Sequence, residues 1–98
     1  MFIAKVVGNV WATRKHRSLE GRKLMLVKPF SPETGACAGE TTLAVDGGTG
    51  CGPGSVVLVL DEGGSARMIL KDENAPVRTL VCGVIDSIDS KGKAVKYA

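Results

Sequence analysis

Sulfur, histidine and aromatic rings are scarce in this sequence, and each shortage removes a class of function. The 98 residues contain three cysteines, one histidine, two phenylalanines, one tryptophan and one tyrosine. Cys37, Cys51 and Cys82 are odd in number and lack C-x-x-C spacing, which favours reduced thiols in a cytosolic protein over a disulfide framework. A zinc site would need His16 together with these scattered thiols, so we expect neither a metal nor any other cofactor.

Long apolar runs and a strong charge excess are also missing. The apolar runs are far shorter than the roughly twenty residues that cross a bilayer, so we expect no membrane partner. The net charge of +3 is mild and does not by itself argue for nucleic acid. His16 is surrounded by basic residues, and most carboxylates fall at expected strand ends, where they commonly cap turns. We therefore expect that the protein is not an enzyme.

The most distinctive stretch is the glycine loop, Asp46–Ser55, which leads directly into the apolar run Val56–Leu60. Its five glycines are too dense for one ordinary turn and predict a crowded place. The apolar run has no polar alternation, which predicts a strand covered on both faces, in a closed barrel or against a partner subunit. Pro53 stands where a Walker loop needs its lysine and where the dinucleotide fingerprint needs its third glycine, so neither phosphate motif is complete.

The rest of the chain is also rich in strand signals. Further strands are expected at Phe2–Thr13, Leu24–Lys28, Thr41–Val45, Thr79–Ile88 and Ala94–Tyr97. The internal Gly8 predicts a kink or bulge in the first of these strands, and Thr79–Ile88 also contains an internal glycine, Gly83. One short helix, Ser65–Leu70, is expected to have Ser65 as its N-cap. We predict a single domain, residues 1–98: an all-β, small five-stranded Greek-key barrel of oligonucleotide-binding (OB) type, with one short helix and a C-terminal hairpin or tail at 90–98.

Small barrels of this type can bind single-stranded nucleic acid, which is the alternative function. Such binding uses several aromatic rings on one face of a basic groove. Phe2 and Trp11 fall on opposite faces by the period-two count, so no stacking platform is evident. A basic segment, made of Arg14, Lys15, Arg17, Arg22 and Lys23, remains a candidate surface for phosphate or for acidic protein partners.

Several segments, in order along nearly the whole chain, share one pattern: Met1–Thr13 with Lys15, Lys23–Val27, Val45–Gly52 with Gly54, Val57–Val59, Gly64–Arg67 and Val84–Asp86. In these segments the chain resembles one family, the vertex proteins of bacterial microcompartments known as the EutN/CcmL type. It implies an OB-like barrel that assembles as a ring of five and closes the vertices of a polyhedral shell beside hexagonal tiles, in the bacterial cytoplasm. Two residues depart from the family pattern: Arg78 replaces an acid, and Cys51 replaces an alanine.

The resemblance also gives candidate sites. A ring of identical head-to-tail contacts hides apolar surface without leaving open ends, and near its axis only small residues fit. We therefore expect the loop Gly50, Cys51, Gly52, Pro53 and Gly54 to lie at the ring axis. Asp46, Arg67 and Asp86 are expected to have structural or subunit-interface roles. The basic segment (Arg14, Lys15, Arg17, Arg22 and Lys23) is expected to form the rim that meets other shell proteins.

Overall fold

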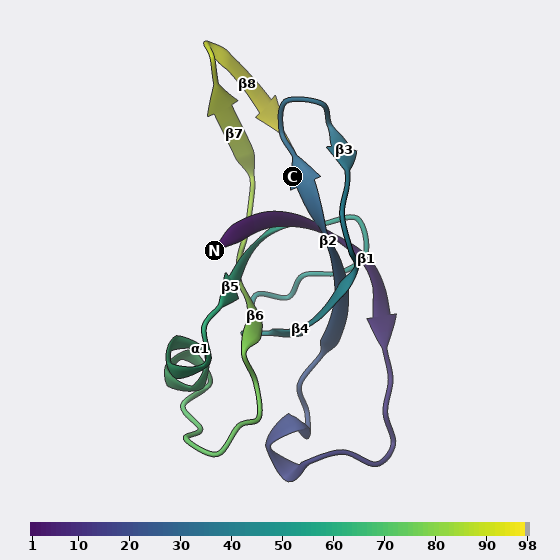
Figure 1. The fold of residues 1–98 in the computed structure, drawn as a ribbon, viewed down its shortest axis with the longest axis vertical. Coiled ribbons are helices and arrows are strands. Elements are labelled where there is room, and N and C mark those ends of the chain that lie inside the picture. Colours follow the sequence, from purple (N-terminus) through teal and green to yellow (C-terminus); the bar gives the residue numbers. More distant parts are fainter. Residues whose placement is uncertain (98) are drawn as a thin grey trace.

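The computed structural model describes residues 1–97, which form eight strands, one α-helix and one short 3-10 helix (Figure 1). The strands are β1 (Phe2–Val10), β2 (Leu24–Ser31), β3 (Ala36–Cys37), β4 (Thr42–Asp46), β5 (Val56–Asp61), β6 (Thr79–Val84), β7 (Ser87–Ser90) and β8 (Lys93–Lys96). The helices are η1 (Arg17–Leu19) and α1 (Gly63–Leu70).

Five of these strands form a closed barrel. They pair in the order β1–β5–β6–β4–β2, and β2 pairs again with β1. The neighbouring strands are antiparallel except β4 and β6, which run parallel and are joined at only two positions, Val45 with Leu80 and Asp46 with Val81. This arrangement confirms the predicted all-β barrel.

Two irregularities of strand pairing bend the barrel wall. In β1 the register shifts at Val7, because Val6 faces Val27 and Gly8 faces the adjacent Leu26. In β6 the register shifts at Cys82 in the same way, directly before Gly83. A bulge increases local twist, which helps a sheet of so few strands to close. The bulge predicted at Gly8 is therefore confirmed, with its extra residue one position earlier, and a second bulge precedes Gly83 in the same way.

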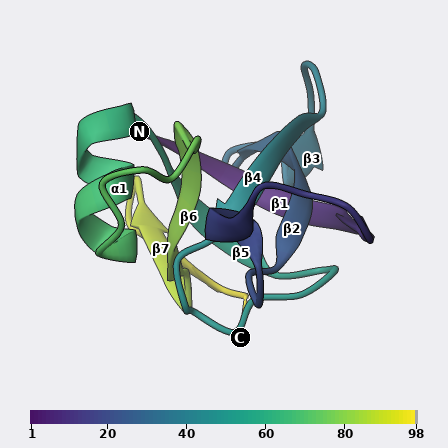
Figure 2. The ribbon, with the colours of Figure 1, turned by 90° about the horizontal axis from the view of Figure 1, so that it is seen from below.

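Apolar side chains fill two separate cores. The inner core lies inside the barrel and holds nine buried residues: Ala4, Val6, Met25, Val27, Ala44, Cys51, Val57, Val59 and Val81. The second core lies outside the barrel wall, beneath α1, and holds Val45, Ala66, Leu70, Ala75, Val77 and Leu80. Seen from below, α1 lies on the β6 side of the barrel and away from β2 and β3 (Figure 2). The apolar run of β5 is thus buried on its inner face and largely covered on its outer face.

The helix begins two residues earlier than the sequence predicted. Its N-cap is Glu62, whose carboxylate accepts from the amides of Gly64 and Ser65 at 2.8 Å each. The prediction of Ser65 as the N-cap was therefore wrong, because the preceding glutamate satisfies the first free amides of the helix. The helix ends at Lys71, which adopts the left-handed conformation with φ 57°.

Other elements also differ from the predictions, and the short strand β3 was not expected. Strand β2 continues through Pro29, whose carbonyl accepts from Ala38, and Phe30 then pairs with Cys37 of β3. The predicted strand Thr79–Ile88 is divided into two strands, since β6 ends at Val84 and β7 begins at Ser87. The 3-10 helix η1 was not expected.

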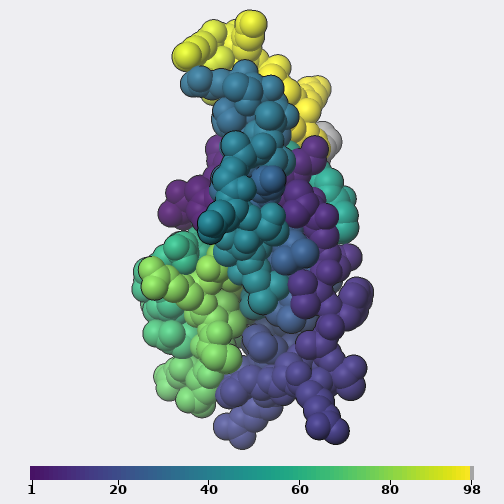
Figure 3. Space-filling view, turned by 45° about the vertical axis from the view of Figure 1, so that its right-hand side comes forward, coloured from purple at the N-terminus to yellow at the C-terminus, as the bar shows by residue number. Residues whose placement is uncertain are grey.

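The C-terminal hairpin, β7 and β8, stands outside the barrel. Its turn has positive φ at Lys91 and Gly92, as a tight type I′ connection requires. The ring of Tyr97 meets Phe30 edge-on at 5.4 Å, and Lys91 pairs with Glu33 at 3.6 Å. Figure 3 shows this hairpin at one end of the molecule and the segment around η1 at the other. None of the helices described for residues 1–97 is long and apolar enough to cross a membrane.

Candidate assembly surfaces

The glycine loop is organised by the buried side chain of Asp46. Its carboxylate accepts from the amide of Thr49 at 3.0 Å, the hydroxyl of Thr49 at 2.6 Å and the amide of Gly50 at 3.1 Å. Burial alone would raise the pKa of Asp46, but the hydrogen bonds from Thr49 and Gly50 outweigh it and hold the pKa below its ordinary value. Asp46 therefore has a structural role within one subunit.

The far end of the loop is a tight turn tied to the barrel. The amide of Ser55 donates to the carbonyl of Gly52 at 2.9 Å, with Pro53 and Gly54 between them and φ +92° at Gly54. Proline followed by a glycine of positive φ is the pattern of a type II turn. Gly54 and Ser55 also exchange hydrogen bonds with Val6, which fixes the turn to β1.

Within a single chain, the crowding predicted for the loop is found only at Gly47, which the sequence analysis did not single out. A β-carbon there would lie 2.8 Å from the carbonyl oxygen of Val81, closer than real β-carbons approach. Gly48, Gly50 and Gly54 are needed for their positive φ, and no atom would crowd a β-carbon at any of them. Gly52 has neither a positive φ nor a close neighbour, so nothing inside the chain requires glycine there.

Cys51 is the one side chain of the loop that enters the inner core, where it is fully buried. Burial raises the pKa of the Cys51 thiol. The Cys51 carbonyl accepts from Lys23 Nζ at 2.9 Å. Beside it, a hollow of about 490 Å³ is lined by Trp11, Gly52 and Pro53, among other residues.

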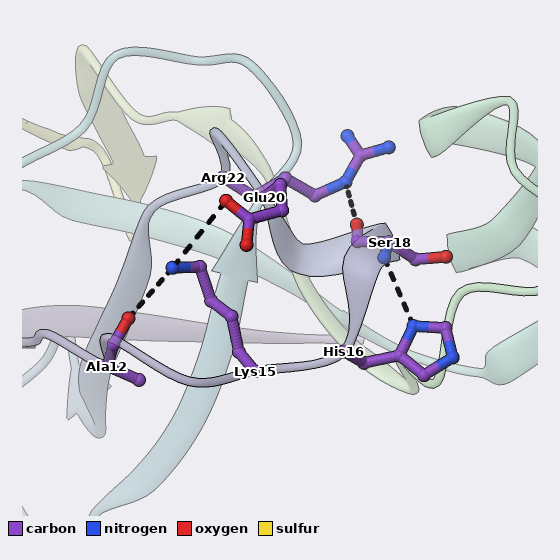
Figure 4. Close-up of polar contacts among 6 residues, drawn as sticks. All are labelled: Ala12, Lys15, His16, Ser18, Glu20 and Arg22. Carbon is purple, nitrogen blue, oxygen red and sulfur yellow. Dashed lines mark hydrogen bonds and ion pairs between the residues drawn. The ribbon is translucent and has the colours of Figure 1, made fainter.

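The basic segment divides into bonded and unbonded side chains, and Figure 4 shows two of the bonded ones, Lys15 and Arg22. Lys15 Nζ donates to the carbonyl of Ala12 at 2.8 Å, and Arg22 Nε donates to the carbonyl of Ser18 at 2.7 Å. Together with the bond from Lys23 to the glycine loop, these contacts give three of the five predicted rim residues a role in the subunit's own fold.

Arg14 and Arg17 are the remaining members of the basic segment. Both are exposed, and neither forms an ion pair or side-chain hydrogen bond with another residue of 1–97. His16 lies between them, and its Nδ1 accepts from the amide of Ser18 at 3.1 Å, which caps η1. The histidine thus caps the short helix η1 from an exposed loop.

Arg67 and Asp86 are exposed and far less constrained than Asp46. In the part of the chain that the structure describes, neither side chain makes an ion pair. Their backbone carbonyls are used: that of Arg67 closes the end of α1, and that of Asp86 accepts from Tyr97 at 2.7 Å. Arg78, the base that departs from the family pattern, pairs with Asp61 at 3.2 Å.

The aromatic rings do not form a binding platform. Phe2 packs on the inner core, Phe30 is buried against Tyr97, and Trp11 is 87% exposed. Trp11 lies beyond the end of β1 at Val10, and the bulge at Val7 interrupts the alternation, so the period-two count used to assign Phe2 and Trp11 to opposite faces does not apply. The two rings still share no surface, because one is packed and the other is exposed. Among residues 1–97, no three His, Cys, Asp or Glu side chains lie close enough together to hold a metal ion.

The fold and these surfaces define a class of protein: a small closed barrel with ordered loops and several exposed apolar side chains. Comparison with known proteins identifies the family within this class. The family model described as ethanolamine utilisation protein EutN/carboxysome matches residues 1–86. The chain belongs to this EutN/CcmL family, which confirms the resemblance seen in the sequence.

Individual relatives match along almost their whole length. The bacterial microcompartment shell vertex protein EutN of Escherichia coli K12 is 35% identical over 95 residues, covering 97% of each chain. The structure of CcmL from Nostoc sp. PCC 7120 superposes with a TM-score of 0.85 at 35% identity and covers 100% of both chains. The GrpN pentameric microcompartment shell protein from Rhodospirillum rubrum gives a TM-score of 0.77 at 33% identity, covering 92% of this chain and 99% of GrpN.

Proposed function

We propose that this protein is a structural shell protein whose homopentamer closes the vertices of a polyhedral bacterial microcompartment, beside hexagonal shell tiles. The observation that carries the proposal is the full-length similarity to vertex proteins, one of which is described as pentameric. The chain's own features agree with it: a 98-residue barrel buries only a modest part of its surface alone and gains stability by covering apolar side chains against copies of itself.

Within this proposal, the loop Gly50–Gly54 lies at the ring axis. Its support is Gly52, where glycine has no reason inside one subunit and a crowded axis supplies one. Gly52→Val should leave the fold of the subunit intact but prevent ring closure, as seen by native mass spectrometry. A Gly52→Val protein that assembles as the parent does would exclude an axial position.

The proposed rim consists of Arg14 and Arg17, the two exposed arginines of the basic segment that are not bonded within the chain. Like-charged rims keep free rings apart and find acidic or carbonyl partners on the tiles. Arg67 and Asp86, exposed and without ion-pair partners in the described chain, are proposed to pair across subunits.

The test of the function is assembly with hexagonal shell proteins. The purified protein should give a ring mass by native mass spectrometry at low and high salt, with no nucleic-acid absorbance at 260 nm. Co-expressed with hexagonal shell proteins, it should yield closed polyhedra by electron microscopy, and shells made without it should be open or elongated. A monomer that carries salt-sensitive nucleic acid would instead support the alternative binding module.

A further inference from the structure

Two glycines in the barrel strands, Gly8 and Gly83, lie on surfaces that are only partly covered within one subunit. Gly8 and Gly83 each follow a bulge, and neither has a positive φ. A β-carbon at Gly8 would lie 3.4 Å from Leu26 Cδ1, and one at Gly83 would lie 3.7 Å from Leu58 Cβ, both ordinary contacts. Alanine therefore fits at either position within the chain. A strand glycine often marks a bulge, which precedes each of these two, or the close approach of another backbone.

Each of these glycines belongs to a row of outward-facing residues. Residues directly paired across a sheet share a face. Gly8 pairs with Leu26, which pairs with Leu43; these three residues form the Gly8 row. Ile3 pairs with Leu58, which pairs with Gly83; these form the Gly83 row.

Burial of the neighbouring residues shows that both rows face away from the barrel interior. Leu58 lies between Val57 and Val59, which are fully buried inside the barrel. Leu43 precedes the buried Ala44 and is itself 48% exposed. Each row therefore places a leucine beside a glycine on the outer face of the barrel, where Leu26 and Leu58 are half-buried and Leu43 is exposed.

The two rows lie on different sides of the barrel. Starting from β1, the Gly83 row runs over β5 and β6, and the Gly8 row runs in the other direction over β2 and β4. In Figure 1, β5 and β6 lie on the left of the barrel, while β2 and the C-terminal half of β1 lie on the right. Two distinct faces on one subunit suit head-to-tail contact, which forms a ring when the rotation closes.

We infer that the Gly8 row of one subunit packs against the Gly83 row of the next copy of this chain, leucine against glycine, and that this contact repeats around the ring. The inference rests on the proposed ring assembly and names its contact surfaces. The occupant is a second copy because a pentameric relative superposes over nearly the whole chain and every residue of the two rows is uncharged and lacks a polar side chain.

The experiment uses one charge in each row. Leu43→Lys damages only the Gly8 row, and Leu58→Lys damages only the Gly83 row. Each variant alone should lose the ring and give a folded monomer by circular dichroism and native mass spectrometry. Mixed at equal concentration, with one variant labelled with nitrogen-15, they should give a heterodimer, because each still carries the intact row that the other needs. Met68→Lys, at a 79% exposed site on α1, is the matched control and should keep the ring.

The outcomes separate the inference from the function on which it rests. If the parent chain forms no ring, the proposed function fails first. If the parent forms a ring and either row variant also does, or if the two monomers do not associate on mixing, the assignment of these rows is overturned. Should a lysine variant fail to fold, Gly8→Ala and Gly83→Ala replace it. Each should raise the protein concentration at which the ring dissociates by roughly tenfold.

Discussion

The glycine loop and the C-terminal hairpin both project from the barrel strands, yet they are held in opposite ways. The loop is fixed from within by the Asp46 carboxylate, a type II turn and the close approach of Gly47 to Val81. The hairpin is a two-stranded piece joined to the body by one aromatic pair and one exposed ion pair. Because an isolated hairpin is marginally stable, the loop belongs to the rigid part of the subunit and the hairpin to its adaptable part.

The largest effect should come from filling the space at Gly47. Gly47→Val would place a side chain against the Val81 carbonyl, which belongs to the barrel wall and cannot move without disturbing it. We expect a loss of about 3 kcal/mol in the free energy of unfolding, measured by urea denaturation. Gly52→Ala is the control, since a β-carbon there meets nothing in the chain. Equal losses in both variants would contradict the view that Gly47 alone is crowded.

Removing the Asp46 carboxylate should have the next largest effect. Asp46→Ala leaves the amides of Thr49 and Gly50 without their acceptor and should cost about 1–3 kcal/mol. The contribution depends on pH: because the pKa is lowered on folding, it is complete above the ordinary value of 3.8 and is lost as the pH falls through the folded-state pKa. The stability difference between parent and Asp46→Ala should therefore shrink in acid. A constant difference would show that the charge is not involved.

A smaller and more local effect is expected in the hairpin. Tyr97→Ala removes the edge-on contact with Phe30, worth about 0.5–1.5 kcal/mol beyond the area buried. Amide hydrogen exchange should accelerate in β7 and β8 while the inner-core strands keep their protection. Exchange that accelerates equally in the barrel would mean that the hairpin and the barrel unfold together, and the distinction between the two regions would be lost.

The smallest effect on the subunit should come from the two exposed arginines. Arg14→Glu with Arg17→Glu should change the free energy of unfolding by less than about 0.5 kcal/mol, because neither side chain is bonded within the described chain. The comparison variant Lys23→Glu should lower stability further, since it breaks the bond from Lys23 to the glycine loop. Thermal unfolding of the two proteins would separate rim residues from fold residues.

The sequence predicted the strands and bulges well because these depend on local patterns. Apolar runs such as Val56–Leu60 and single glycines such as Gly8 carry their signal in a few neighbouring residues. The helix cap was missed for a local reason: glutamate is not a favoured N-cap, and two glycines follow Glu62.

Other features that could not be predicted depend on contacts distant in sequence. The need for glycine at position 47 comes from Val81, and the structural role of Lys23 comes from the carbonyl of Cys51. In the sequence, Lys23 looked like any other member of a basic cluster. The family resemblance gave the correct assembly class, but it could not separate the residues that build the subunit from those available for contacts between subunits.

The parallel seam between β4 and β6 has a consequence for how the barrel moves. It is the shortest of the pairings that close the barrel, with two paired positions against four or more elsewhere. Partial opening of the native state should begin where the fewest bonds must break, so this seam should part before the others. Such an opening would release Asp46 and admit solvent to the Cys51 thiol behind it. The rate at which a thiol reagent modifies Cys51 would then measure how often this seam opens. Enclosure of the seam in an assembled shell should slow the modification.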